Sequence, residues 1–353
     1  MKEGCKKLET RVQIPAAAFM NFPQSAIFAF NANLDHVKYC TDEDLAAIEQ
    51  FSPTLSGQIS ESFAYGMQKE VAIDIRACEF FLTKMKFERI IIGGQAGNAA
   101  QQASALGVKC FVHSNFANEE LAKKFNFPDK VLLPNEKGFT PAATSFTSHT
   151  KSAHHFVFEN RESRIRFIAS YDPFPMHPED NFTYNISKEL PGIQKAFVGG
   201  FHLLKTPDRM RKFLSEMKKW KQANPKLQFF CELGEFQSPE VMDAVRSELL
   251  PFMDMVGLTD SELAQMGAEA DELASQTGAT VLFHTPEKQS VYPESKLNGA
   301  ALEFAKRCAS YKARTGKAAT EAEVAGASAE FVESPLQTVG LGDTFSCAYF
   351  MSA

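Results

Sequence analysis

The chain has 353 residues, with 37 Lys and Arg against 43 Asp and Glu, so its formal net charge is −6 at pH 7. An apolar share of 44% and this small net charge exclude a mainly disordered protein. The mild acidity gives no electrostatic reason to expect nucleic acid or an anionic membrane surface as a partner. No segment approaches the ~20 apolar residues that cross a bilayer, and the seven cysteines are scattered, so we expect a cytoplasmic protein.

Short apolar segments and helical patterns alternate along most of the chain. Strands are expected at 26–30, 89–92, 108–113, 196–198, 227–231, 253–256 and 280–283. Helices are expected at 97–106, 119–125, 207–222, 239–250 and 261–275. This alternation predicts an α/β fold with a mostly parallel sheet that carries helices on both faces.

Two segments depart from the alternation. Residues 39–84 carry few parallel-strand signals, and three β-like stretches follow one another at 143–147, 154–158 and 164–169. Consecutive short strands predict a small antiparallel sheet. We therefore expect residues 1–353 to form a single unit. Insertions at about 33–84 and 139–172 build a β-rich lid on a large α/β domain.

The segment 338–346, with the sequence TVGLGDTFS, has the pattern of a tight turn that leads into a helix. Gly340 and Gly342 allow a close backbone approach, and the free N–H groups and dipole of a helix start attract an anion. Asp343 fits this place if it faces a hydroxyl beside a phosphate and accepts its proton. A plain turn with Asp343 as the helix N-cap explains the pattern equally well.

Two more polar clusters follow expected strands. The segment 93–98, GGQAGN, opens a helix, and its Gln95 and Asn98 suit a neutral, hydroxyl-rich ligand better than a pyrophosphate. The alternative is a tight turn with packing glycines. Asn31, Asn33 and Asp35 lie on one side of an extended strand end, where they can bridge neighbouring sugar hydroxyls. Ordinary strand-end turn chemistry is the alternative for this cluster.

In this order, the three clusters resemble those of the ADP-dependent sugar kinases, the ADP-specific glucokinases and phosphofructokinases of the ribokinase superfamily. Further segments match the same pattern, at 166–170, 197–204, 231–233, 257–263 and 283–285. The resemblance implies a ribokinase-like parallel-sheet sandwich, with a small β-rich lid that closes over a sugar.

The resemblance also implies a role for each matching residue. Asp343 would be the catalytic base, Gly340 and Gly342 would form the anion hole, and Arg166 would reach the phosphates from the lid. The sugar would be bound by Asn33, Asp35, Gly94, Gln95 and Asn98. Mg²⁺ would be held, mostly through water, by Glu232 and Glu262. The nucleotide would lie against His284, Thr285, Val339 and Leu341.

The function that the resemblance implies is a magnesium-dependent kinase. It would transfer the β-phosphoryl group of ADP to a hydroxyl of glucose or fructose 6-phosphate and release AMP, so its partners would be a small sugar and a nucleotide. One alternative is an ATP-using sugar or nucleoside kinase. A second is a catalytically weakened sugar-binding or regulatory homologue. The second alternative is suggested by two departures from the family's motifs. Thr259 replaces the asparagine of Asn-x-x-Glu, and Phe230 replaces the histidine of His-x-Glu. The oligomeric state is left open.

Overall fold

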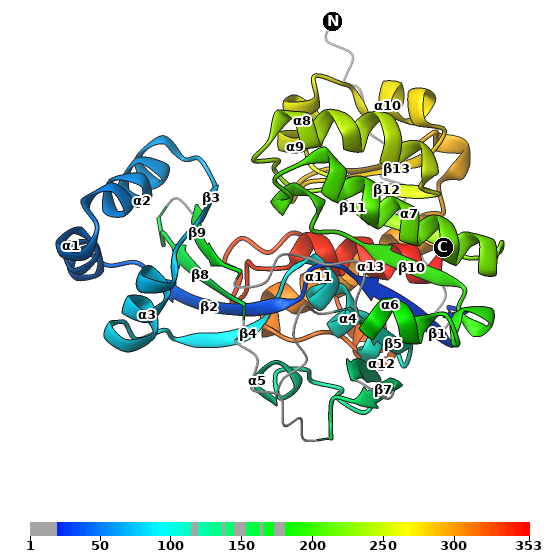
Figure 1. Ribbon diagram of the computed structural model, residues 1–353, viewed down its shortest axis with the longest axis horizontal. Helices are drawn as coiled ribbons and strands as arrows, with labels where there is room; N and C mark the ends of the chain where they lie inside the picture. The colour runs from blue at the N-terminus through cyan, green and yellow to red at the C-terminus, as the bar shows by residue number, and fades with distance from the viewer. Residues whose placement is uncertain (1–19, 114–118, 136–137, 145–152, 163–164, 173–180) are drawn as a thin grey trace, which may run out of the picture.

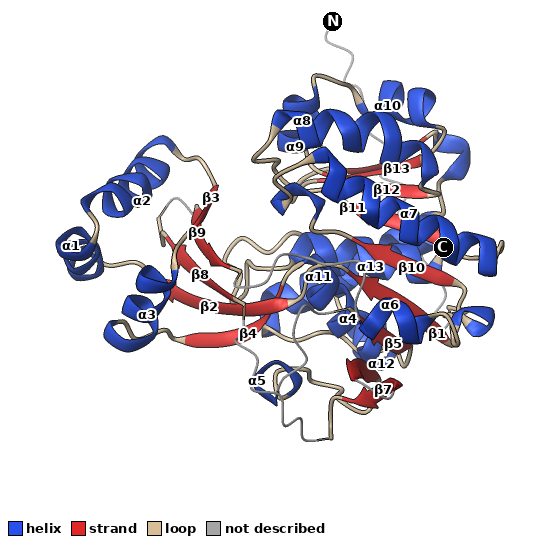
Figure 2. Cartoon of the chain, in the orientation of Figure 1, coloured by secondary structure: helices blue, strands red, loops and turns tan. Residues whose placement is uncertain are grey.

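The computed structural model describes residues 20–353 except 114–118, 136–137, 145–152, 163–164 and 173–180. Within these residues the strands form two sheets, a nine-stranded sheet in a large domain and a five-stranded sheet in a smaller lid. Figure 1 shows the lid standing to one side of the large domain, and Figure 2 shows helices against both sheets.

The large sheet is parallel except at its two edges. Its strand order is β14-β13-β12-β11-β10-β1-β5-β6-β7, and among the described strands of this sheet only the pairs β13–β14 and β6–β7 are antiparallel. The bounds are β1 Ser25–Ala29, β5 Lys109–Val112, β6 Val131–Asn135, β7 Gly138–Pro141, β10 Lys195–Val198, β11 Gln228–Glu232, β12 Met255–Leu258, β13 Thr280–His284 and β14 Gln289–Tyr292.

Helices cover both faces of this sheet because its central strands are apolar on both sides. In β1, Ala26 and Phe28 enter one core and Ile27 and Ala29 the other. The first core is closed by α4 (Gln95–Ala105), α5 (Glu119–Ala122), α11 (Gly299–Thr315), α12 (Glu321–Gly326) and α13 (Leu341–Ser352). The second is closed by α6 (Asn181–Ile186), α7 (Pro207–Ala223), α8 (Pro239–Ala244), α9 (Asp260–Met266) and α10 (Ala270–Thr277). None of the described helices is long and apolar enough to span a bilayer.

The lid sheet is mixed, with the order β3-β9-β8-β2-β4. Its strands are β2 (Asn33–Tyr39), β3 (Lys69–Ala72), β4 (Arg89–Gly93), β8 (His154–Glu159) and β9 (Arg166–Tyr171). One face packs its apolar side chains against the helices α1 (Asp42–Phe51), α2 (Pro53–Tyr65) and α3 (Ile75–Lys84). Val37 and Val157 of the sheet form another apolar cluster with Val339 of the large domain. The lid therefore contacts the segment that leads into α13.

The chain passes between lid and large domain at two points that matter for function. Residues 30–32 connect β1 to β2, and Gly93 and Gly94 connect β4 to α4. Both connections carry the polar clusters that the sequence singles out, so these clusters lie at the junction of the two parts (Figure 1).

The sequence predicts most strands of the large sheet correctly, but assigns two strands to the wrong part. Residues 89–92 were expected in the large sheet and lie in β4 of the lid, antiparallel to β2. Residues 139–141 were expected in the lid and form a hairpin with β6 of the large sheet. Apolar periodicity identifies a strand but not its partner, and only two residues separate β6 from β7 in the sequence. Residues 145–147 lie outside the described residues.

Two further expectations need correction. The lid sheet is not purely antiparallel, because the N-terminal segment contributes β2 and β3, which pair parallel with β8 and β9. The helix expected over 261–275 is two helices, α9 and α10, since the chain turns at Gly267 with a φ of +59°. Such a left-handed residue ends a helix, and glycine adopts it without strain.

Candidate active site

The turn that precedes α13 is shaped by Gly340. This residue is the N-cap of the helix with a φ of +69°, and a Cβ there would lie 2.2 Å from Asn98 Oδ1. Glycine therefore allows α4 and α13 to approach each other closely. Gly340 offers no side-chain cap to the N–H groups of the first helical turn, which leaves them for an anion. Asp343 is the third residue of the helix, so the alternative that made it the N-cap is wrong.

Asp343 is surrounded by charged groups from several elements. Burial, followed by the Glu232 carboxylate, raises the pKa of Asp343 to about 7, although Lys312, His284 and Asn98 oppose the shift. A carboxyl group with such a pKa is ionised above neutral pH and binds a proton readily. These are the properties that a general base needs.

We expect kcat to fall as the pH is lowered through about 7, because a protonated Asp343 cannot take a proton from a hydroxyl. The measurement is a kcat–pH profile at saturating substrates, from about pH 5.5 to 8.5, with unfolding monitored at each pH. A rate that stays flat over this range would contradict the assignment of Asp343 as the base.

Lys312 lies next to this turn and is not among the residues that the sequence motifs single out. The helix α11 was not expected, and its Lys312 Nζ donates to Asn98 Oδ1 at 2.9 Å, to Gly340 O at 3.1 Å and to Thr344 Oγ1 at 3.1 Å. A signal was present in the sequence, because Lys312 continues with helical spacing a stripe of small apolar residues, Ala301, Ala305 and Cys308. A lysine in such a position is either buried with hydrogen-bond partners or interrupts the apolar face of the helix.

The residues predicted to bind the sugar gather where the chain enters the lid. Asn33 Nδ2 donates to Asp35 Oδ1 at 2.6 Å, while the buried Asn33 Oδ1 has no hydrogen-bond partner among the described residues. Burial raises the pKa of Asp35 to about 6, against the opposing effect of His155. Gly94 has a φ of +74°, and a Cβ there would lie 2.6 Å from Asn33 Oδ1. An unpaired acceptor beside a carboxylate is suited to bind neighbouring hydroxyl groups.

Gln95 and Asn98 are already held by protein groups. Gln95 donates through Nε2 to Leu233 O and accepts at Oε1 from Gly200 N at 2.6 Å, so it connects the loops after β10 and β11. Asn98 Nδ2 donates to Gly94 O at 3.1 Å. The direct sugar contacts predicted for these two side chains stay predictions, and their observed contacts stabilise the wall of the site.

Two strand ends of the large sheet bring Glu232 and His284 together. His284 Nε2 lies 2.9 Å from Glu232 Oε1, and both side chains are buried. Burial by itself would lower the pKa of His284, but the carboxylates of Glu232, Glu262 and Asp343 outweigh it and raise that pKa. The other oxygen, Glu232 Oε2, is buried and has no hydrogen-bond partner in the described part of the chain.

Glu262 lies in the first turn of α9, where it forms a capping box with Thr259. Its Oε2 accepts from both the backbone N and the Oγ1 of Thr259, each at 2.5 Å. Burial raises the pKa of Glu262, and the nearby Glu232 carboxylate adds to the shift. Two neighbouring carboxylates with one unpaired oxygen fit Mg²⁺, which takes one or two carboxylates and keeps much of its water. Groups of three or more metal-ligating His, Cys, Asp or Glu side chains are absent from the described residues.

We expect Thr259→Ala to lower the free energy of unfolding by about 1 kcal/mol, the usual net contribution of one side-chain hydrogen bond, here the bond from Thr259 Oγ1 to Glu262. It should also raise the Mg²⁺ concentration that activity requires by about 10-fold or more, because Glu262 loses one of the two donors that orient it. Thr320→Ala is a matched control, since Thr320 forms the same capping box with Glu323 on α12. Equal Mg²⁺ requirements in the two variants would contradict a metal role for Glu262.

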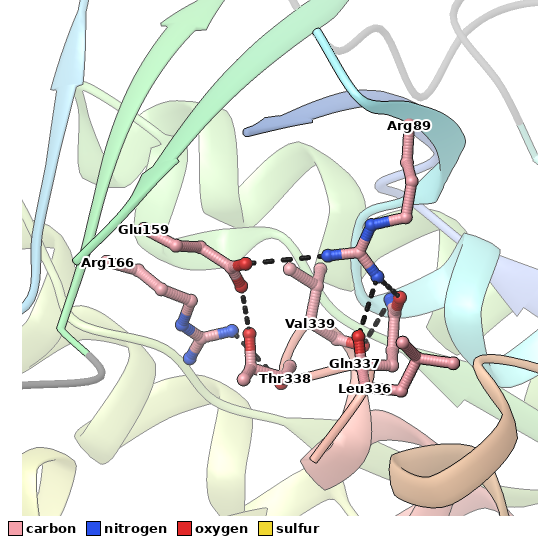
Figure 3. Close-up of polar contacts among 7 residues, drawn as sticks. All are labelled: Arg89, Glu159, Arg166, Leu336, Gln337, Thr338 and Val339. Atoms are coloured by element: carbon pink, nitrogen blue, oxygen red, sulfur yellow. Dashed lines mark hydrogen bonds and ion pairs between the residues drawn. The ribbon is translucent and has the colours of Figure 1, made fainter. Parts of the chain in front are cut away.

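The lid reaches the turn through Arg166 and Glu159 (Figure 3). Arg166 Nη1 donates to Thr338 O at 3.3 Å, and Thr338 Oγ1 donates to Glu159 Oε1. As the alternation in β9 predicts, Phe167 points instead into the core beneath the lid helices. The Glu159 and Asp343 carboxylates both act on the Arg166 guanidinium, which places this cation near the turn that precedes α13.

A second lid arginine holds the same loop. Arg89 donates through Nη1 to Leu336 O at 3.0 Å and to Gln337 Oε1 at 2.6 Å, while its Nη2 lies 3.4 Å from Glu159 Oε2 (Figure 3). Gln337 Nε2 in turn donates to Val339 O at 3.1 Å. Polar contacts from two lid strands therefore fix the path of the chain into α13.

The residues expected to contact the nucleotide are not alike in their surroundings. Val339 is buried against the lid valines, so its side chain and its carbonyl are both engaged. Thr285 Oγ1 accepts from Lys288 N at 3.0 Å in the turn after β13, and Leu341 is the first residue of α13. His284 is paired with Glu232 as described above. Nucleotide contacts at these four positions stay predictions.

Comparison with known proteins identifies the family. The model of the ADP-specific phosphofructokinase/glucokinase conserved region matches residues 25–298. The chain belongs to the ADP-specific phosphofructokinase/glucokinase family. It is 22% identical to an ADP-specific phosphofructokinase of Methanosarcina acetivorans in an alignment that covers 73% of this chain and 64% of the relative. The chain thus matches less than two thirds of that relative's length.

Solved members of this group share the fold. A hypothetical ADP-dependent phosphofructokinase from Pyrococcus horikoshii superposes with a TM-score of 0.75 at 18% identity, covering 94% of this chain and 98% of that one. An ADP-dependent kinase in complex with fructose 6-phosphate and ADPβS superposes with a TM-score of 0.77 at 16% identity, covering 93% of both chains. The predicted ribokinase-like α/β fold is thereby confirmed.

Proposed function

We propose that this member of the ADP-specific phosphofructokinase/glucokinase family transfers the β-phosphoryl group of ADP to a sugar hydroxyl and releases AMP. The observation that carries the proposal is the start of α13, where a half-buried carboxyl group with a raised pKa lies beside uncapped helix N–H groups. Phosphoryl transfer needs a positioned base and charge stabilisation more than covalent catalysis, and this arrangement supplies both.

In the proposed reaction, Asp343 accepts the proton of the sugar hydroxyl while the hydroxyl oxygen attacks the β-phosphorus. The bond from the β-phosphorus to the bridging oxygen breaks, and AMP leaves with that oxygen. The backbone N–H groups at Gly342 and its neighbours bind the oxygens of the transferred group, and Arg166 balances their charge from the lid. Asn33 and Asp35 hold the sugar hydroxyls. The lid excludes water, which would otherwise accept the phosphoryl group.

Glu232 and Glu262 would hold Mg²⁺, which would neutralise charge on the phosphates when bound. Within the chain, the carboxylates around His284 raise its pKa, which favours its protonated form beside Glu232. A Cβ at Gly342 would lie 3.0 Å from His284 Cε1, so the imidazole closely approaches the start of α13.

Two observations point to different acceptors. Two of the relatives named above are phosphofructokinases, and a third, an ADP-dependent kinase, is in complex with fructose 6-phosphate, which favours a sugar phosphate. Around Asp35, however, His155 lies 3.2 Å from Asp172 and 3.7 Å from Glu70. The Asp172 and Glu70 carboxylates neutralise the charge of His155 and would repel the phosphate group of a sugar phosphate. This favours an uncharged sugar such as glucose. Fructose 6-phosphate and glucose are therefore both proposed acceptors.

The experiment is a matrix of donors and acceptors. ADP and ATP are each paired with glucose and fructose 6-phosphate at saturating Mg²⁺, and AMP or ADP formation is followed. We expect turnover with ADP and one of the acceptors. Turnover with ATP alone would establish the ATP-dependent kinase instead. Sugar binding by calorimetry without turnover on either donor would establish the weakened homologue.

A further inference from the structure

Lys312 is a buried cation whose three N–H donors are all used. Its side chain comes from α11 and its relative exposure is 4%. The acceptors belong to separate parts of the site: Asn98 Oδ1 on α4, the N-cap carbonyl of Gly340 and the Oγ1 of Thr344 on α13. An ammonium group has three donors, so this set satisfies it fully and fixes its position.

The contact with Asn98 fixes the orientation of that amide. Because Oδ1 accepts from Lys312, the amide nitrogen must point the other way, where it donates to Gly94 O at 3.1 Å. The Asn98 side chain also acts on Asp343, whose pKa it lowers, so it favours the ionised form of that carboxyl group. Without the ammonium, the amide could turn over and present its oxygen to the carboxylate.

The contact with Gly340 fixes the turn itself. The Gly340 carbonyl accepts from Lys312 and also from Thr344 N at 3.1 Å, the first backbone bond of α13. Both lone pairs of this oxygen are then engaged, so the left-handed peptide at Gly340 has little freedom to rotate. The N–H groups that follow it keep their direction as a result.

We propose that Lys312 is a positioning residue for phosphoryl transfer, which holds the Asn98 amide and the Gly340 carbonyl so that Asp343 and the first N–H groups of α13 face the reacting groups. This inference rests on the function proposed above. Besides the direct effect of its charge on Asp343, Lys312 acts through its hydrogen bonds with Asn98 and Gly340.

A purely structural role predicts something different. A side chain that only fills space can be replaced by an apolar side chain of similar volume at little cost. Methionine would continue the apolar stripe of α11. If Lys312 only filled space, Lys312→Met would leave the turn and the reaction unchanged.

The test compares Lys312→Met with Lys195→Met. Lys195 is also buried and donates to the Phe350 carbonyl at the other end of α13, so it controls for loss of a buried ammonium against the same helix. Hydrogen–deuterium exchange of the peptide that covers residues 338–345 is measured first, because it needs no turnover. We expect faster exchange at this turn in Lys312→Met and wild-type exchange in Lys195→Met.

Kinetics provide the second measurement. With the donor and acceptor that wild type uses, we expect Lys312→Met to lower kcat by about 10- to 100-fold, as small misplacements of reacting groups do, with KM for both substrates changed little. Thr344→Val removes one of the three acceptors and should give a smaller change in the same direction, and it replaces Lys312→Met if that variant does not fold. Exchange and kcat equal to those of Lys195→Met would overturn the proposal. If wild type shows no kinase activity, the exchange measurement still decides the role of Lys312.

Discussion

Asp343→Asn should lower kcat by about 100- to 10,000-fold, the contribution that a positioned general base makes. The amide keeps the size of the carboxyl group and its place in the first turn of α13, but it cannot accept the proton of the attacking hydroxyl. Binding of ADP and of the sugar, measured by calorimetry, should stay within a few-fold of wild type because the turn and the sugar-side residues are unchanged.

Two variants make this result specific. Asp44→Asn alters a partly buried lid carboxylate that pairs with Lys38, and it should leave kcat unchanged. Asp35→Asn alters the sugar side, so it should raise KM for the sugar more than it lowers kcat. Asp343→Asn with more than about a tenth of wild-type kcat would exclude Asp343 as the base.

Arg166→Lys should lower kcat/KM for the nucleotide by about 100-fold, the usual loss when one charge-stabilising contact of the transition state is removed. Arginine can bind two phosphate oxygens at once with its planar fork, which lysine cannot do. Affinity for the sugar and the melting temperature should change little, because Phe167 and the other core residues of β9 are untouched.

Arg166 also connects parts of the protein, and a second variant separates this role from catalysis. Its Nε and Nη2 donate to Gln68 Oε1 at 3.0 and 2.7 Å. Gln68→Leu removes these contacts and keeps the guanidinium. We expect near-wild-type kcat/KM from Gln68→Leu. If it is as slow as Arg166→Lys, the arginine acts by organising the lid and does not reach the phosphates.

Local sequence signals predicted the fold well where a strand is buried on both faces. The apolar run in β1 enters two cores, and such runs between helices indicate a parallel sheet. The same reasoning failed for β4, whose Ile90 is exposed and whose partner is β2 of the lid. Periodicity gives the faces of a strand, but its neighbours depend on contacts distant in sequence.

The candidate site could be predicted from the sequence where one short motif contains all the residues that form the local structure. The glycines around Leu341 and the acid after them imply a turn, a helix start and a carboxyl group in one segment, and the structure shows all three. Lys312 could not be placed, because its partners are 28 and 214 residues away along the chain. Thr259 departs from the family's motif, and the structure explains the threonine by the capping box that it forms with Glu262.

The most direct test of the central claim follows the phosphoryl group itself. The enzyme, in excess over ADP labelled in its β-phosphoryl group, is mixed with Mg²⁺ and the acceptor found in the matrix, and the products are separated after a single turnover. The label should appear in the sugar product, with one unlabelled AMP for each labelled sugar. Label in inorganic phosphate, or label retained in ADP while the sugar is bound, would contradict the account of α13 as a phosphoryl-transfer site.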